Sequence, residues 1–218
     1  DFASSEFAAD LFRVAVRDTG GSGDAAPTEY SDAIEFFRRT YLTDGLRELL
    51  QRSAARLAGN PNADAVINLQ TTFGGGKTHS MLAVWHLFSG RPLHEFPQDV
   101  QDVLVGHHED VVGTAVKRVT IVGNEIAPGQ PTTKPDGTVV NTLWGEIAWQ
   151  LGDQAGDAAG AYAYVAEADA TGTNPGGALR DLFAAYGPAV ILIDEWVSYA
   201  RQLNTRRQLD DGSLAPLP

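Results

Sequence analysis

Three features of the 218-residue chain predict an α/β fold with three layers, in which helices cover both faces of a parallel sheet. Short apolar runs rich in β-branched residues alternate with longer segments of helical periodicity. One apolar run is followed at once by a glycine loop and a helix, and another ends in two carboxylates. Continuous apolar runs are typical of strands that are buried on both faces, which favours a parallel sheet.

The N-terminal region, residues 1–62, is predicted to be helical. Residues 5–16 have the periodicity of an amphipathic helix. Residues 31–59 predict a short helix, a break near residues 43–45 and a longer helix, which the glycine at position 59 ends.

Residues 63–218 are predicted to form the sheet-containing core, with a hairpin insertion at about 126–140 around the turn Pro135–Gly137. Asn141 or Thr142 is the expected N-cap of the helix that follows. The expected buried strands lie within residues 64–70, 118–123 and 188–196, and the expected helices within 77–90, 141–152 and 177–187.

The glycine loop "QTTFGGGKT" predicts a phosphate-binding site. The P-loop pattern is G-x-x-x-x-G-K-[ST], which Lys77 and Thr78 fit, although Thr71 replaces the first glycine. Glycines let backbone N–H groups point at phosphates, and a helix N-terminus adds partial positive charge. Lys77 would reach the β- and γ-phosphates of ATP, and the Thr78 hydroxyl would bind Mg²⁺. The expected nucleotide-binding residues are Thr72, Phe73, Gly74, Gly75, Gly76, Lys77, Thr78 and His79.

The run "AVILIDEW" supplies the second half of an ATPase site. Asp194 would hold Mg²⁺, and Glu195 would orient or deprotonate the attacking water. Asn124 follows another strand and could hydrogen-bond Glu195, or it could be an ordinary solvent-facing strand end. Either motif alone also occurs in loops and strand ends without function, but the two together, in this order, indicate a P-loop NTPase.

The amino-acid composition excludes several kinds of site and partner. The chain has no cysteine, which excludes disulfides and thiolate metal sites, and no apolar run long enough for a membrane span, so we expect a cytoplasmic protein without a membrane partner. A net charge of −12 with few lysines disfavours non-specific nucleic-acid binding by this chain. Trp144, Trp149 and Trp196 are interpreted as core aromatics. Because the chain starts at Asp1 and stops within a loop-like segment, we expect it to be part of a larger protein.

The stretches "RRTYLTDGLRELL", "LQTTFGGGKTHSMLAVWHL", "VGNEIAPGQPTTKPDGTVVNTLWGEIAWQLG" and "AVILIDEWVSYARQL" resemble a family of large bacterial and archaeal AAA+ ATPases. That family was long catalogued as a domain of unknown function, and its members occur in phage-defence gene clusters, including phage-growth-limitation systems. Its P-loop form also lacks the first glycine. The family's sensor strand, arginine finger and lid lie outside this stretch, so we expect weak hydrolysis by the isolated chain.

The resemblance implies an AAA+-type sheet and Mg·ATP hydrolysis. Lys77 and Thr78 would bind phosphate and metal, Asp194 would bind metal, Glu195 would be the base, and Asn124 would restrain it. Partners would be further copies of the chain or other defence-system subunits, with nucleic acid reached through the rest of the protein.

Two functions remain open from the sequence. The first is an ATPase that powers a defence complex. The second is a nucleotide-gated assembly module with little turnover. Glu195 favours the first because a binding switch needs no water-activating carboxylate, whereas the acidic charge mildly favours the second.

Overall fold

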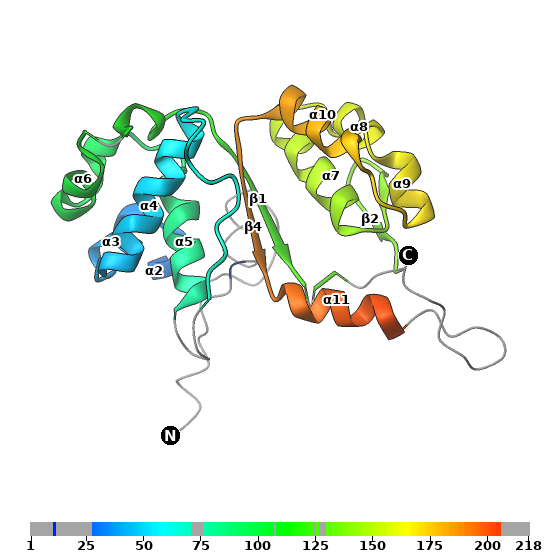
Figure 1. The fold of residues 1–218 in the computed structure, drawn as a ribbon, viewed down its shortest axis with the longest axis horizontal. Helices are drawn as coiled ribbons and strands as arrows, with labels where there is room; N and C mark the ends of the chain where they lie inside the picture. The colour runs from blue at the N-terminus through cyan, green and yellow to red at the C-terminus, as the bar shows by residue number, and fades with distance from the viewer. Residues whose placement is uncertain are drawn as a thin grey trace, which may run out of the picture. The chain divides into compact units, whose positions relative to one another are not determined.

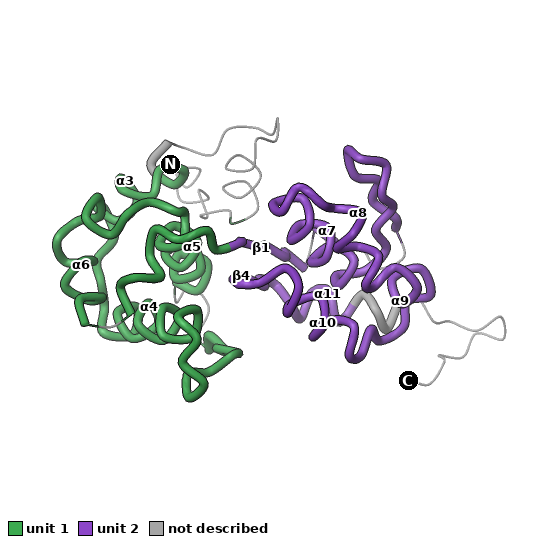
Figure 2. The backbone as a smooth tube through the Cα atoms, turned by 90° about the horizontal axis from the view of Figure 1, so that it is seen from above, with its two compact units in different colours: residues 1–116 green, residues 117–218 purple. Residues whose placement is uncertain are grey.

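The computed structural model describes residues 11, 28–70, 76–106, 108–123, 125–126 and 130–205, excluding the side chains of 28, 29 and 202–205. The chain divides into two compact units, residues 1–116 and 117–218 (Figure 2). The sequence places its boundary earlier, at residue 62. The compact division falls later because α5 (Lys77–Leu87), which follows the glycine loop, packs on α3 (Ala33–Arg38) and α4 (Asp44–Leu57) within the first unit.

Unit 1 is built from helices. Asp32 caps α3 by accepting hydrogen bonds from two backbone N–H groups, and the Thr43 hydroxyl caps α4 by accepting from one, that of Leu46. These caps reproduce the predicted short helix, break and longer helix. The remaining elements of unit 1 are α2 (Thr28–Ser31), α6 (Gln98–Leu104) and the 3₁₀ turns η2 (Leu93–Glu95) and η3 (Glu109–Val111).

The core of unit 1 surrounds α5. Every residue from 81 to 87 is buried, so α5 is covered on all sides rather than on one face. Phe36 and Phe37 of α3 and Leu50 of α4 are also buried in this unit. The helix predicted directly after the glycine loop is therefore confirmed (Figure 1).

The buried strand predicted at residues 64–70 is wrong. These residues have no regular secondary structure, and the Val66 side chain is 83% exposed. Asp64 forms an ion pair with Arg52 of α4 instead. A β-prone run needs a neighbouring strand to satisfy its backbone, and no described strand pairs with this segment.

Unit 2 is a mixed α/β structure with a two-stranded parallel sheet. Strands β1 (Lys117–Val122) and β4 (Ala189–Asp194) pair in register from Lys117↔Ala189 to Val122↔Asp194. A second, antiparallel pair, β2 (Thr132–Thr133) with β3 (Val139–Val140), forms the predicted hairpin. The helices are α7 (Leu143–Ala155), α8 (Ala158–Ala163), α9 (Ala166–Thr171), α10 (Gly177–Tyr186) and α11 (Trp196–Thr205).

Helix α7 packs against β1 and organises the core of unit 2 (Figure 1). Ile147, Ala148 and Leu151 of α7 join Val119 and Ile121 of β1 in one buried cluster. Strand β4 is less buried than β1, because only Leu192 of β4 is buried whereas Ile193 is 39% exposed. The predicted strands at 118–123 and 188–196 are confirmed, as is a mixed α/β fold with helices and a short parallel sheet.

Glutamine side chains of α7 bind the edge of β1 that faces away from β4. The side-chain oxygen of Gln150 accepts from the Thr120 N–H at 3.0 Å, and its nitrogen donates to the Thr120 carbonyl at 3.0 Å. Gln154 makes the same pair of contacts with Arg118 at 2.8 Å each. The two glutamines therefore satisfy this edge as a third strand would.

Candidate functional site

The N-terminus of α5 carries the lysine and threonine of the predicted phosphate loop. Helix α5 begins at Lys77, and the preceding Gly76 has a left-handed backbone with φ 74°. Gly76 is the N-cap residue and contributes no side-chain hydrogen bond to the helix. Lys77 and Thr78 are half-buried, and within the described residues no ion pair involves Lys77. The first turn of α5 thus presents backbone N–H groups and a cation at one end of the helix.

His79, in the same turn, makes contacts within unit 1. Its Nε2 lies 3.1 Å from the hydroxyl oxygen of Thr40, and its ring is 4.7 Å from the Phe36 ring centroid. Burial lowers the pKa of His79 below its ordinary value, because the surroundings disfavour the charged imidazolium. The side chain is consequently tied to Thr40 through one of its two nitrogens.

The carboxyl end of β4 carries the two acidic residues. Asp194 is the last residue of β4 and is half-buried, whereas Glu195 is exposed. Glu195 has a positive φ of 50°, which for a residue other than glycine is uncommon and costs free energy. Its N–H donates to Asp194 Oδ1 at 2.9 Å, so the two residues form a tight turn between β4 and α11.

Helix α11 starts directly after this turn. The Glu195 carbonyl accepts from the Ser198 N–H at 2.9 Å and from the Tyr199 N–H at 3.4 Å. Tyr199 is buried, and its hydroxyl oxygen accepts from the Leu143 N–H at 3.4 Å, which ties α11 to the start of α7. The interpretation of Trp196 as a core aromatic is wrong: its side chain is 49% exposed, because it is the first residue of α11 and lies beside the open end of β4.

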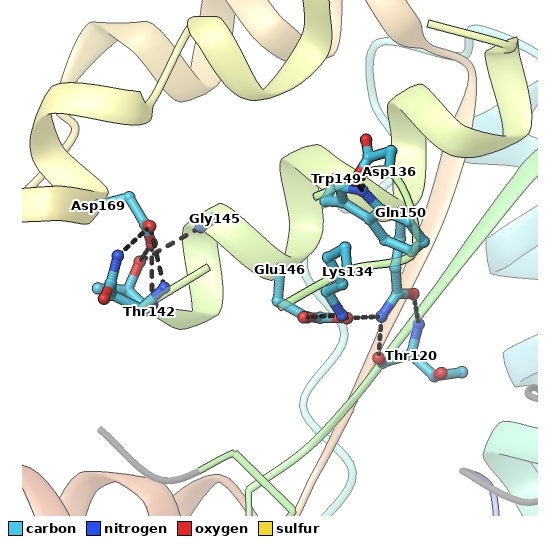
Figure 3. Close-up of polar contacts among 10 residues, drawn as sticks. Thr120, Lys134, Asp136, Thr142, Gly145, Glu146, Trp149, Gln150 and Asp169 are labelled. Carbon is cyan, nitrogen blue, oxygen red and sulfur yellow. Dashed lines mark hydrogen bonds and ion pairs between the residues drawn. The ribbon is translucent and has the colours of Figure 1, made fainter. Parts of the chain in front are cut away.

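A buried carboxylate closes the N-terminus of α7. Asp169 is fully buried and accepts from the backbone N–H groups of Asn141 and Thr142 at 2.9 and 2.8 Å, as Figure 3 shows in part. It also accepts from the Asn141 amide, the Thr142 hydroxyl and the Tyr162 hydroxyl. Thr142 is the N-cap, one of the two predicted alternatives. Sequence reasoning missed Asp169, since an acidic residue in an alanine-rich helix gives no local sign of burial.

The hairpin is held against α7. Lys134 forms a partly buried ion pair with Glu146 of α7, with 2.6 Å between Nζ and Oε2, and lies 4.7 Å from the centroid of a Trp149 ring (Figure 3). The Trp149 indole N–H is shared between the two carboxylate oxygens of Asp136, each at 3.2 Å. The Lys134 ammonium is already paired with Glu146, so it is not available to bind a nucleic-acid phosphate.

The structure thus brings together part of the predicted site. In unit 2 it places Asp194, Glu195 and Gly123 at the same ends of the two parallel strands. In unit 1 it places Gly76, Lys77, Thr78 and His79 in one helical turn. The predicted residues Thr72, Phe73, Gly74, Gly75 and Asn124 lie outside the described residues.

Comparison with known proteins gives a family. No helix in the described ranges is long and apolar enough to cross a membrane. Neither a curated protein nor a solved structure matches the chain. The DUF499 N-terminal domain matches residues 6–214, nearly the whole sequence, and the chain therefore belongs to this domain-of-unknown-function family.

Proposed function

We propose that this chain is the Mg²⁺-dependent, ATP-binding and ATP-hydrolysing module of a larger prokaryotic protein, with a P-loop NTPase core of the AAA+ type. The observation that carries the proposal is the start of α5, where Lys77 is the first helical residue after a left-handed glycine that has no side chain to cap the helix. An anion completes such a helix end, because the first N–H groups have no intrahelical acceptor.

The end of β4 supports the same function. Asp194 and Glu195 stand where a strand gives way to a helix, and each can act on a different part of the reaction. Asp194 offers a hard oxygen donor of the kind Mg²⁺ prefers, as does the Thr78 hydroxyl of the phosphate-loop motif. On the motif pattern each would be a metal ligand, and the metal would neutralise charge on the phosphates when it is bound.

Each residue then has a definite task in hydrolysis. Glu195 accepts a proton from a water molecule whose oxygen bonds to the γ-phosphorus while the bond to the β–γ bridging oxygen breaks. ADP and inorganic phosphate leave, and the proton passes to solvent. Lys77 offsets the negative charge on the β- and γ-phosphates throughout this step, and Asn124 holds Glu195 back until a partner binds.

An assembly module gated by nucleotide is the second candidate, and one observation favours it. Ile193, Trp196 and Val197 are exposed apolar side chains on either side of the two carboxylates. Exposed apolar groups of this size favour contact with another protein. Further copies of the chain or other subunits of a cytoplasmic phage-defence complex are the proposed partners, with DNA or RNA engaged by the rest of the protein.

Steady-state Mg·ATP hydrolysis by the full-length protein, with and without duplex DNA, tests the proposal. Glu195→Gln should bind ATP as the wild type does but reduce turnover by about 100-fold or more, the usual cost of losing a general base. Lys77→Ala should lose ATP binding itself. Tight ATP binding with equal, negligible turnover in wild type and Glu195→Gln would leave the assembly module and reject the ATPase.

A further inference from the structure

We infer that Gly123 is a positioning residue for Glu195: the absence of a side chain at the end of β1 creates the space in which the chain turns left-handed at the end of β4. The catalytic meaning of this inference rests on the proposed function, whereas the structural coupling of the two residues does not. Neither the family match nor the phosphate-loop pattern assigns a role to this glycine.

Gly123 continues the strand pairing by one residue. Its N–H donates to the Asp194 carbonyl at 2.9 Å, just beyond the last registered pair, Val122 with Asp194. The glycine is therefore held against the turn that Asp194 and Glu195 make. It lies in unit 2, as do all the residues on which the inference depends.

The approach is too close for any side chain. A Cβ on Gly123 would lie 2.2 Å from the Glu195 carbonyl oxygen and 2.9 Å from its carbonyl carbon. It would also lie 3.1 Å from Cβ of Tyr199. Two of these three atoms are backbone, so no side-chain rotation relieves the overlap. Gly123 has no left-handed φ of its own, so space rather than backbone freedom requires glycine here.

The Glu195 carbonyl is not free to move away. It accepts the hydrogen bonds that begin α11, from Ser198 and Tyr199. Tyr199 is in turn fixed, because it is buried and its hydroxyl oxygen binds the Leu143 N–H. Displacing the carbonyl would break the first turn of α11 or pull Tyr199 out of the core.

The left-handed backbone sets the direction of the Cα–Cβ bond of Glu195. A strand residue at this position would direct its Cα–Cβ bond to one face of the sheet, whereas a φ of 50° turns that bond in another direction. Glutamate does not adopt this conformation readily, so its surroundings must enforce it. Gly123 is part of these surroundings, and the left-handed conformation of Glu195 depends on its lack of a side chain.

ATP-analogue affinity and turnover, measured on the same Gly123→Ala variant, distinguish a positioning role of Gly123 from a purely structural one. Gly123→Ala should leave the affinity for a fluorescent ATP analogue nearly unchanged in the full-length protein. Turnover should fall by about 100-fold, which is the effect of a displacement of roughly 1 Å at a catalytic group. Gly177→Ala is the matched control, because Gly177 is also in unit 2, has no left-handed φ, and a Cβ on it would lie 3.6 Å from Nη2 at the end of the Arg180 side chain. Wild-type turnover in Gly123→Ala, or loss of turnover equalled by Gly177→Ala, overturns the inference.

A stability cycle separates this inference from the proposed function. Glycine accepts a left-handed backbone without strain, so Glu195→Gly should be at least as stable as Glu195→Ala in thermal unfolding. In the Gly123→Ala background, Glu195→Gly should recover part of the lost melting temperature, because the turn can then take another path. Additive losses overturn the coupling of the two residues. A wild-type protein without turnover, combined with a non-additive cycle, rejects the ATPase and leaves the coupling standing.

Discussion

The N-termini of α5 and α7 differ in the acceptors that lie beside their first backbone N–H groups. At the start of α7, the Thr142 hydroxyl accepts from the Gly145 N–H, Asp169 accepts from two further N–H groups, and Tyr199 accepts from the Leu143 N–H. At the start of α5, the N-cap residue is a glycine, which has no side chain to cap the helix.

This difference separates a helix end whose N–H groups bind acceptors from the folded chain from a helix end that suits an anionic ligand. Helix α7 obtains its acceptors from residues up to 56 positions away, and its end is buried with them. The first turn of α5 instead places Lys77 beside its own N–H groups, so both the dipole and the side chain favour an anion. The carboxylate at α7 is therefore structural, whereas the lysine at α5 is the cation to which the proposed function assigns phosphate binding.

The largest expected effect is on stability, at Asp169. Asp169→Ala removes one buried acceptor from the N–H groups of Asn141 and Thr142 and from the Tyr162 hydroxyl. Leaving these donors unsatisfied should lower the free energy of unfolding by about 4 kcal/mol. Urea denaturation measures it, with the exposed Asp181→Ala as control, expected within about 0.5 kcal/mol of wild type. A loss at Asp169 no greater than at Asp181 would remove the basis of the comparison.

The second effect is on binding, at Lys77. Lys77→Ala should weaken ATP binding by about 100-fold, or about 2.7 kcal/mol, by removing the cation from the phosphates. Because no described carboxylate pairs with Lys77, the free energy of unfolding should change by less than about 0.5 kcal/mol. Isothermal titration and urea denaturation of the same samples give both values, and Lys117→Ala serves as a control for lost charge. A destabilised Lys77→Ala with intact binding would make Lys77 structural.

Two glycines sharpen the comparison at a smaller scale. A Cβ on Gly145 would lie 2.2 Å from Oδ1 of Asp169, whereas a Cβ on Gly76 would meet no atom of the described residues within 4 Å. Gly145→Ala should therefore cost about 2 kcal/mol through overpacking. Gly76→Ala should cost about 1 kcal/mol, only for the left-handed backbone. Equal losses of unfolding free energy in the two variants, measured by urea denaturation, would show that a Cβ at Gly145 causes no overpacking, contrary to this prediction.

The sequence predicts elements with strong local signals and misses those that depend on distant partners. Helices α4, α5, α7 and α10 follow from apolar periodicity, and β4 follows from its apolar run. Helices α6, α8 and α9 lie in stretches for which the sequence predicts no element. These helices have only six or seven residues each, so tertiary packing rather than periodicity defines them.

The candidate site shows the same division. Lys77, Thr78, Asp194 and Glu195 are visible in the sequence because their motifs are local. Asp169 is invisible because its five contacts join residues that are 7 to 28 positions apart. The requirement for glycine at position 123 is equally hidden, since it depends on the Glu195 carbonyl across the sheet.

The smallest expected effect is a pH dependence at the start of α5. Burial lowers the pKa of His79 from its ordinary 6.5, so between these two values the folded chain binds fewer protons than the unfolded chain. The contribution of His79 to stability is therefore fully present above pH 6.5 and is lost as the pH falls through the folded pKa. His79→Gln should remove this slope from urea midpoints measured between pH 5 and 7.5, with His94→Gln as an exposed control.

Nucleotide links this titration to the comparison of the two helix ends. An anion bound at the first turn of α5 would stabilise the His79 imidazolium and raise its pKa, so ATP affinity should rise as the pH falls. The reciprocal statement is that ATP should flatten the acid side of the stability profile in the wild type but not in His79→Gln. A profile unchanged by ATP, in a protein that binds ATP, would place the phosphates away from His79. Such a result would confine the anion to Lys77, Thr78 and the glycine loop.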